Sequence, residues 1–383
     1  MIDAIARVEA FPVAPRWLFV RIETHDGVVG WGEASLEGYA DVVLAAVEQF
    51  ATYLVGKDPG RIEDHWQVLT KGQFYRGGAV LASAVAGVDQ ALWDLKGKHL
   101  GVPVHDLLGG PVRDRIRAYG WVGGDDPAEV ADHISAQLEA GLTAVKMNAS
   151  GKMNRNGSVA ELDAVVARVA SARAVLGPHR DVAVDLHGRF TLATARRLAP
   201  LLAPLHPFFI EEPVVPENSH VIGRMVDATT IPIATGERLY SRQEFLPVLQ
   251  AGVAIAQPDL SHAGGISEVR RIAALADTFD AVIAPHCPLG PIALAACLQV
   301  GFATPNYLIQ EQSIGIHYNE GAEVLDYVVD TAPLKFVEGG FERLTGPGLG
   351  IEVDEHAVRD ASSHWTRWEN PIWRHADGSV AEW

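Results

Sequence analysis

Seven acidic and histidine side chains stand where apolar runs of the sequence end. In DVAVDLHGRF, Asp185 and His187 lie two residues apart at the end of a strand-like run. Because side chains alternate along a strand, both point to the same side. The other five close the segments FFIEEP, IPIATGE, VAIAQPDL, DAVIAPH and YLIQEQ, and they are Glu211, Glu237, Asp259, His286 and Glu311.

Three of these acids end three successive predicted strands. Neighbouring parallel strands lie about 4.8 Å apart, so the carboxylates of Asp185, Glu211 and Glu237 would repel one another without a cation between them. Oxygen ligands from three points, completed by water and substrate, are typical of Mg²⁺. The sequence therefore predicts a Mg²⁺ site. The alternative is that these acids cap helices or pair with Arg189 and Arg238.

The other four residues could move or hold protons around that cation. His286 and Asp259 end adjacent predicted strands, and a carboxylate beside an imidazole orients the ring and raises its basicity. His187 would reach the same cavity from the opposite side. Glu311, if protonated, could hydrogen-bond a substrate carboxylate, and a salt bridge is its alternative role. A purely structural role is the alternative for a single histidine.

This set of groups fits the removal of a proton next to a carboxylate. Such a proton is weakly acidic, so the enediolate must be stabilised as it forms by a divalent cation and a hydrogen-bond donor. A general base contributes roughly 10²–10⁴-fold. The cation must therefore carry the larger share of the rate.

The elements that position these groups repeat as strand and then helix from Ile116 onward. The eight strand segments are IRAYGWVG, TAVKMN, DVAVDLH, PFFIEEP, IPIATGE, VAIAQPDL, DAVIAPH and NYLIQEQ. Continuous apolar runs are typical of buried parallel strands. A doubly wound sheet could share the pattern, but eight repeats without a Gly-rich phosphate motif favour an α/β fold of the (β/α) TIM-like barrel type. Chemistry in such barrels lies at the carboxyl ends of the strands.

The regions on both sides of the barrel lack this repeat. Residues 1–35 alternate as antiparallel strands, and helices are predicted over 41–56, with Asp41 as N-cap, over 60–71 and over 81–100. A short strand over 346–354 should return to the N-terminal module, and the final WRHADGSVAEW is interpreted as surface packing. We expect an α+β capping domain over 1–114, the barrel over 115–320 and a C-terminal segment over 321–383 that returns to the cap.

Composition excludes several classes of protein. The formal net charge of −17 leaves no basic surplus for nucleic-acid binding. Two cysteines, Cys287 and Cys297, are too few for a disulfide scaffold. The first residues do not resemble a signal peptide, and no apolar run reaches the roughly 18 residues of a membrane span. We expect a cytoplasmic protein that binds a small molecule and neither nucleic acid nor membrane.

These features together resemble the enolase superfamily, and within it the mandelate racemase subgroup. The likeness rests on the α+β cap, the Asp, Glu and Glu on strands three to five, and the His and Asp on strands seven and six. Long strings add to it, among them GVDQALWDLKGK, GERLYSR, QPDLSHAGGI, APHCPLGPIALAACL and WRHADGSVAEW. Racemases of the subgroup carry Lys-x-Lys after the second strand. This chain has Lys146-Met147-Asn148 there and so lacks the second lysine as an opposing base.

The resemblance implies a role for each residue of the set. It implies that Asp185, Glu211 and Glu237 bind Mg²⁺ and that His286, tuned by Asp259, is the base at C2. It further implies that His187 is the acid for the leaving 3-hydroxyl and that Glu311 stabilises the enediolate. A base with Mg²⁺ and an ene-diolate is the general pattern of this superfamily. Contacts with substrate are expected from Arg16, Tyr75, Arg76, Lys146 and Asn148.

The reaction that the resemblance implies is loss of water from a six-carbon aldonic acid. Its longer strings point to D-galactonate as the substrate and 2-dehydro-3-deoxy-D-galactonate as the product, in a homo-oligomer. Dehydration of another sugar acid is the first alternative. A racemase or epimerase and a non-catalytic binding barrel are the others.

Overall fold

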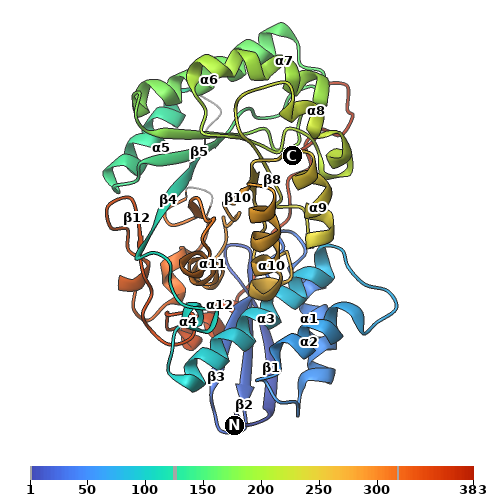
Figure 1. The fold of residues 1–383 in the computed structure, drawn as a ribbon, viewed down its shortest axis with the longest axis vertical. Helices are drawn as coiled ribbons and strands as arrows, with labels where there is room; N and C mark the ends of the chain where they lie inside the picture. The colour runs from blue at the N-terminus through green and yellow to red at the C-terminus, as the bar shows by residue number, and fades with distance from the viewer. Residues whose placement is uncertain (1, 124–126, 317–318) are drawn as a thin grey trace.

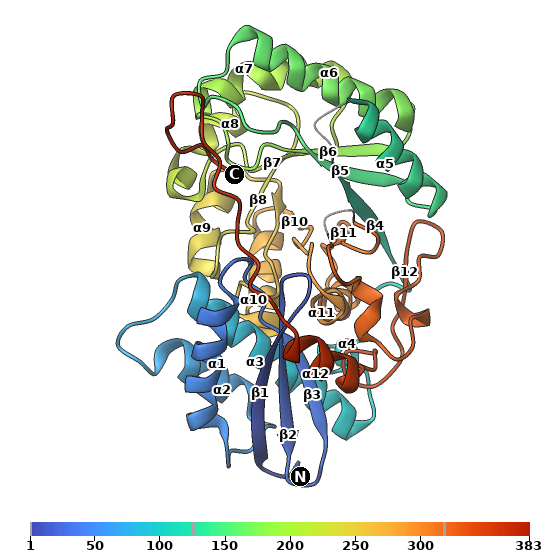
Figure 2. The ribbon, with the colours of Figure 1, turned by 180° about the vertical axis from the view of Figure 1, so that it is seen from behind.

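The computed structural model describes residues 2–123, 127–316 and 319–383, which form two parts in contact (Figure 1). One part contains parallel strands with helices around them. The other contains three antiparallel strands and the helices that follow them. The end of the chain runs from the second part to the first (Figure 2).

Eight parallel strands form the barrel. They are β4 Arg115–Val122, β5 Ala144–Asn148, β6 Asp181–Asp185, β7 Ile210–Glu211, β8 Ile233–Thr235, β9 Ile255–Ala256, β10 Val282–Ile283 and β11 Gln310–Gln312. Each strand pairs with the next from β4 to β10, and β11 pairs with β4. A parallel bridge between Ile283 and Tyr307 joins β10 to the residues before β11 and closes the ring. The predicted barrel is confirmed.

The interior of the ring is filled by a layer of buried side chains, one from each strand or its flank. These are Tyr119, Ala144, Ala183, Phe209, Ala234, Ile255, Ala284 and Ile309. Large and small residues share the layer, as a packed barrel core requires. The strands are shorter than predicted. Glu237, Asp259 and His286 lie two or three residues beyond the ends of β8, β9 and β10. The charged side chains therefore lie at the carboxyl ends, beyond the packed layer.

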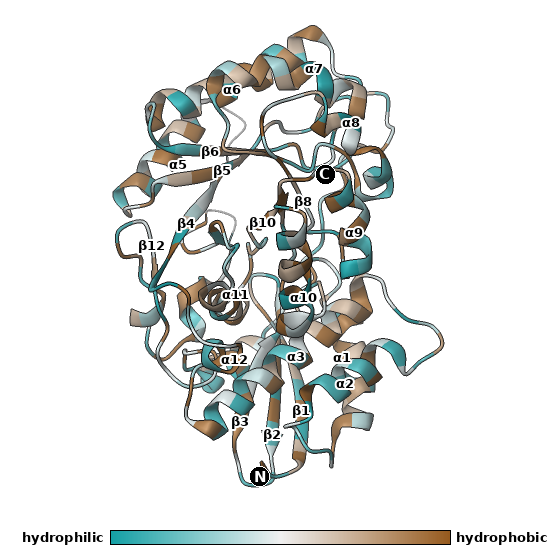
Figure 3. Cartoon of the chain, in the orientation of Figure 1, coloured by the Kyte–Doolittle hydropathy of each residue, from teal (hydrophilic) through white to brown (hydrophobic). Residues whose placement is uncertain are grey.

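Helices follow the strands around the barrel. They are α5 Pro127–Glu139, α6 Val159–Leu176, α7 Leu192–Leu202, α8 Gly223–Val226, α9 Arg242–Gln250, α10 Gly265–Thr278 and α11 Pro291–Ala303, with 3-10 turns at Ala203–Leu205 and Pro216–Val221. Figure 3 shows hydrophobic and hydrophilic residues alternating along α5 to α7, as expected of helices with one buried face. Ser158 and Glu161 form a capping box that starts α6. No helix in the described ranges is long and apolar enough to cross a membrane.

The cap is built on the hairpin strands β1 Ile5–Val13, β2 Trp17–Thr24 and β3 Val29–Glu33. Its helices are α1 Ala40–Leu54, α2 Ile62–Lys71, α3 Ala79–Leu100 and the short α4 Val104–Leu107. The prediction of Asp41 as N-cap is wrong, because the cap position is Tyr39 and Asp41 lies in the first turn. Gly101 ends α3 in the left-handed conformation (φ 69°), which glycine adopts without strain.

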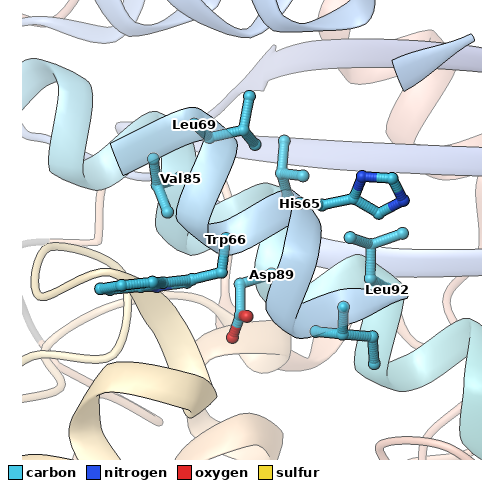
Figure 4. A pocket seen from close by; sticks show the side chains of 8 residues that line it. His65, Trp66, Leu69, Val85, Asp89 and Leu92 are labelled. Carbon is cyan, nitrogen blue, oxygen red and sulfur yellow. The ribbon is translucent and has the colours of Figure 1, made fainter. Parts of the chain in front are cut away.

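Polar contacts connect the cap to the barrel. Trp66 of α2 and Asp89 of α3 line the small pocket between these helices (Figure 4). The Trp66 indole N–H donates to the main-chain oxygen of Gly264 at 2.9 Å, and the main-chain N–H of Ser267 donates to Asp89 at 2.9 Å. Glu33 accepts the main-chain N–H groups of Gly290 and Ala293 at the start of α11, each at 2.9 Å. These contacts fix the cap next to the loops that follow β9 and β10.

The tail contributes to both parts. Strand β12 Gly340–Glu342 pairs antiparallel with β4, and helix α12 Glu355–Ser363 packs beside β1, where Glu355 binds Arg21 at 3.1 Å. Two 3-10 turns, Val324–Tyr327 and Ala332–Leu334, precede them. The predicted strand over 346–354 does not form as an element. Only single bridges occur there, from Gly348 to Pro103 and from Val353 to Val328. The boundaries 1–114, 115–320 and 321–383 stay predictions.

Candidate active site

Three buried carboxylates meet at the ends of neighbouring strands. Asp185 ends β6 and pairs in register with Glu211 at the end of β7, and Glu237 lies two residues past β8. One carboxylate oxygen from each lies within 4.8 Å of the others. Burial, followed by the charge of a neighbouring carboxylate (Glu211 for Asp185, Glu212 for Glu237), raises the pKa of Asp185 and of Glu237 well above their ordinary values. A divalent cation would relieve this repulsion.

The surrounding polar atoms fit a hard cation with an oxygen-bearing ligand. Asn148 Oδ1 and Gln257 Oε1 are buried and have no hydrogen-bond partner among the residues that the structure describes. The amide of Gln257 donates to Glu211 at 2.7 Å. Three carboxylates with adjacent unpaired amide oxygens are the donor set that Mg²⁺ prefers. Gln257 was not predicted as a site residue, although it lies two residues before Asp259 on the same run.

Lys146 lies among the carboxylates. Its ammonium group is 2.8 Å from Glu211 and 2.8 Å from Glu311, and it lies over the Tyr119 ring at 5.7 Å. Burial opposes the charged form, but Glu211 and Glu311 outweigh it and raise the pKa of Lys146 well above its ordinary value. Burial likewise opposes ionisation of Glu211, and Lys146 outweighs it, so the pKa of Glu211 is lowered. Lys146 therefore remains a cation between two carboxylates.

His286 is oriented from one side of the cluster. Its Nδ1 lies 2.8 Å from Asp259, and its Nε2 lies 3.6 Å from Glu237. Burial disfavours the charged ring, but Glu237 and the hydrogen bond to Asp259 outweigh it, so the pKa of His286 is raised well above its ordinary value. His262, not predicted from the sequence although it follows Asp259 by three residues, lies 3.6 Å from the Asp259 carboxylate and 3.3 Å from Ser83 of α3.

His187 approaches the carboxylate of Glu237 through its Nε2. That atom is 4.0 Å from Glu237, while Nδ1 is 2.8 Å from the main-chain oxygen of Trp383. His187 has a φ of 51°, in the left-handed region that non-glycine residues rarely adopt. Burial, followed by the charges of Arg189 and Arg238, lowers the pKa of His187 well below its ordinary value. Two imidazoles thus contact one carboxylate, one at each of its oxygens.

The remaining predicted residues occupy different environments. Glu311 forms the salt bridge that was its alternative role, and it also accepts the main-chain N–H of Cys287 at 3.0 Å. Arg16 is buried and donates to Glu37 at 3.2 Å and to the oxygen of Pro288, near His286, at 3.0 Å. Tyr75 is 85% exposed in the loop between α2 and α3, which projects from the cap in Figure 1, and Arg76 is also exposed. Substrate contacts by these residues stay predictions.

Two family descriptions match most of the chain. The mandelate racemase / muconate lactonizing enzyme N-terminal domain matches residues 12–109, and the enolase C-terminal domain-like family matches residues 129–357. The chain belongs to the mandelate racemase / muconate lactonizing enzyme family of the enolase superfamily. The resemblance seen in the sequence is confirmed.

Relatives within this family match over the whole length. The D-galactonate dehydratase of Variovorax paradoxus is 53% identical over 380 residues, and that of Ralstonia nicotianae is 53% identical over 381. Both alignments cover 99% of this chain and 100% of the relative.

Solved structures of the superfamily have a similar fold. An enolase from Agrobacterium radiobacter with bound Na and L-malate has a TM-score of 0.89 at 32% identity, covering 99% of this chain and 100% of its own. A member of the enolase superfamily from Salmonella Typhimurium has a TM-score of 0.84 at 28% identity, covering 94% and 98%.

Proposed function

We propose that this chain catalyses the Mg²⁺-dependent dehydration of D-galactonate to 2-dehydro-3-deoxy-D-galactonate. The observation that carries the proposal is the 53% identity with D-galactonate dehydratases over 99% of the chain. The site supplies chemistry for the same reaction, because two imidazoles flank a carboxylate cluster suited to a divalent cation.

The carboxylates of Asp185, Glu211 and Glu237 would hold the metal. Bound Mg²⁺ supplies electrostatic stabilisation to the substrate carboxylate as negative charge develops there. Lys146 sets the charge around this cluster, because it neutralises part of the negative charge on Glu211 and Glu311. Asn148 Oδ1 and Gln257 Oε1 are available to accept substrate hydroxyl groups.

His286 removes the proton from C2 of the substrate. Asp259 accepts a hydrogen bond from Nδ1, which directs Nε2 into the site and favours the protonated ring that forms after the transfer. A base held in this way is worth roughly 10²–10⁴-fold in rate.

His187 completes the elimination on the other side of the cluster. The electron pair left at C2 forms the C2–C3 double bond as the C3–oxygen bond breaks, and the proton on Nε2 of His187 leaves with the hydroxyl group as water. Nε2 of His187 faces one oxygen of Glu237 while His286 faces the other, so the two rings can act on the substrate from different sides of the cluster. The enol product then takes a proton at C3 and becomes the 2-keto acid.

The test is a panel of sugar acids with Mg²⁺, scored for formation of a 2-keto-3-deoxy acid. Turnover mainly of D-galactonate supports the proposal. Turnover mainly of another aldonate would keep the dehydration chemistry and refute the substrate assignment. Absence of turnover across the panel, with Mg²⁺ and with Mn²⁺, would refute the proposed function.

A further inference from the structure

The last part of the chain, residues 365–383, crosses from the cap to the catalytic end of the barrel. We call it the tail segment. In Figure 2 it leaves α12 beside β1 and runs past β8 to its last residue, which lies near β8 and α8 in both ribbon views. From the sequence alone, its final residues were expected to pack on the surface. Their contacts point to another role.

The tail segment is attached along its length. Asn370 donates to the main-chain oxygen of Glu37 in the cap at 3.3 Å. On the barrel side, the Arg189 guanidinium lies 4.8 Å from the Trp373 ring, and Lys152 donates to the main-chain oxygen of Arg374 at 2.6 Å. These anchors join the segment to both parts of the molecule.

The end of the tail segment folds back on itself. An antiparallel bridge joins Arg374 to Val380, and the main-chain N–H of Ala381 donates to the oxygen of Trp373 at 3.0 Å. Gly378 has a φ of 88°, as the turn between them requires. This turn directs Trp383 back toward the barrel, where Glu382 is 3.3 Å from Arg155.

Trp383 contacts His187 in two ways. Its main-chain oxygen lies 2.8 Å from Nδ1, and its ring lies edge-on to the imidazole with centroids 5.9 Å apart. The Trp368 ring packs against Trp383 at 6.1 Å. Because a main-chain oxygen only accepts hydrogen bonds, Nδ1 of His187 must carry the hydrogen, and Nε2 is the atom directed toward Glu237.

We propose that the tail segment is part of the active site and that Trp383 is a positioning residue for His187. The inference rests on the proposed function, because it assigns Trp383 to the step in which the hydroxyl group leaves. His286 is held from a different direction, by Asp259, and within the described ranges its ring lies against Asp259, Glu237 and His262 rather than against the tail segment. Loss of Trp383 should therefore impair elimination and spare proton removal from C2.

The test compares the full chain with Trp383→Ala and with the conservative variant Trp383→Phe. Phe279→Ala is the matched control, because Phe279 is a partly exposed aromatic residue before β10, at the opposite end of the barrel. Each protein is incubated with D-galactonate and Mg²⁺ in D₂O. Two rates are measured: formation of the keto acid, and exchange of the C2 hydrogen in recovered substrate.

Trp383→Ala should lower keto-acid formation by about 10²-fold, as expected when a catalytic group is displaced by about 1 Å. In the same variant, exchange at C2 should continue. Trp383→Phe should recover most of the dehydration rate. Phe279→Ala should resemble the parent protein in both rates. Unchanged dehydration in Trp383→Ala would overturn the proposal. Equal losses of both rates would also overturn it, because they would indicate a general structural role.

A second readout needs no substrate. In protein labelled with ¹⁵N-histidine, the Nδ1–H signal of His187, assigned with His187→Asn, should indicate a hydrogen bond in the parent protein and in Phe279→Ala. Trp383→Ala keeps the main-chain oxygen but loses the ring contacts with His187 and Trp368 that hold this oxygen against Nδ1, so the signal should change; an unchanged signal would overturn the proposal. If the parent protein turns over no sugar acid, the proposed function fails while this signal still decides the role of Trp383. If Trp383→Ala does not fold, Trp368→Ala is judged by the same measurements, because it removes only the ring beside Trp383.

Discussion

Lys146 is the residue whose replacement most directly tests the electrostatic arrangement of the site. Lys146→Met keeps much of the length and apolar volume of the side chain and removes its charge. The parent ammonium group is buried and lies 2.8 Å from both Glu211 and Glu311, so the variant leaves two buried carboxylates without their cation. Breaking a buried ion pair by removing one partner costs about 3–5 kcal/mol.

This cost converts to a measurable change in melting temperature. An unfolding entropy of about 2.1 cal/mol/K per residue, taken over 383 residues, gives about 0.8 kcal/mol/K. A loss of about 3–5 kcal/mol therefore lowers Tm by about 4–6 °C if the chain unfolds as one unit. The assay is thermal unfolding in EDTA and in excess Mg²⁺. The deficit should shrink with Mg²⁺, because a cation on the carboxylates offsets part of the missing charge.

The exposed Lys335 provides the matched control. Lys335→Met removes the same charge from the surface and should change the free energy of unfolding by no more than about 0.5 kcal/mol. The reasoning is refuted if Lys146→Met melts within 1 °C of Lys335→Met in EDTA, where about 4–6 °C is expected. It is also refuted if the deficit is the same with and without Mg²⁺.

Three further predictions concern the metal and the base. Removal of metal by EDTA should abolish dehydration and lower Tm, and Mg²⁺ should restore both; activity that survives exhaustive chelation would contradict the carboxylate site. His286→Asn should lower keto-acid formation by roughly 10²–10⁴-fold and abolish C2 exchange while calorimetry still detects Mg²⁺ binding; unchanged turnover would remove His286 from the mechanism. Asp259→Asn should lower the pKa of His286, because the carboxylate favours the charged ring. Since the neutral ring is the active base, kcat/KM rises as pH rises through this pKa. The acid limb of the kcat/KM profile should therefore move to lower pH in the variant. An acid limb that stays in place or moves to higher pH would contradict the role of Asp259.

Much of the site could be predicted from local patterns. Asp185, Glu211, Asp259 and Glu311 end apolar runs, and closing eight such runs into a barrel places their carboxyl ends at one rim. The prediction needed only strand periodicity and the number of repeats. The exact ends of the strands were harder to predict, since Glu237 lies beyond the end of a three-residue β8.

The features that could not be predicted depend mostly on contacts between distant segments. Trp383 meets His187 across 196 positions of the chain, and no periodic pattern predicts such a contact. Helix α12 is an exception, because it follows Asp354, whose side chain accepts the N–H of Ala357 as an N-cap, and such a cap is a local signal. The exposed positions of Tyr75 and Arg76 depend on the path of a loop, which residue types alone do not determine.

The most direct test of the account is the isotopic course of D-galactonate turnover in D₂O with Mg²⁺, followed by NMR. The account predicts 2-dehydro-3-deoxy-D-galactonate that carries solvent deuterium at C3, because the enol formed by loss of the 3-hydroxyl takes its last proton from solvent. Recovered D-galactonate with deuterium at C2 and no keto acid would instead indicate proton transfer without elimination, and would contradict the assignment of this chain as a dehydratase.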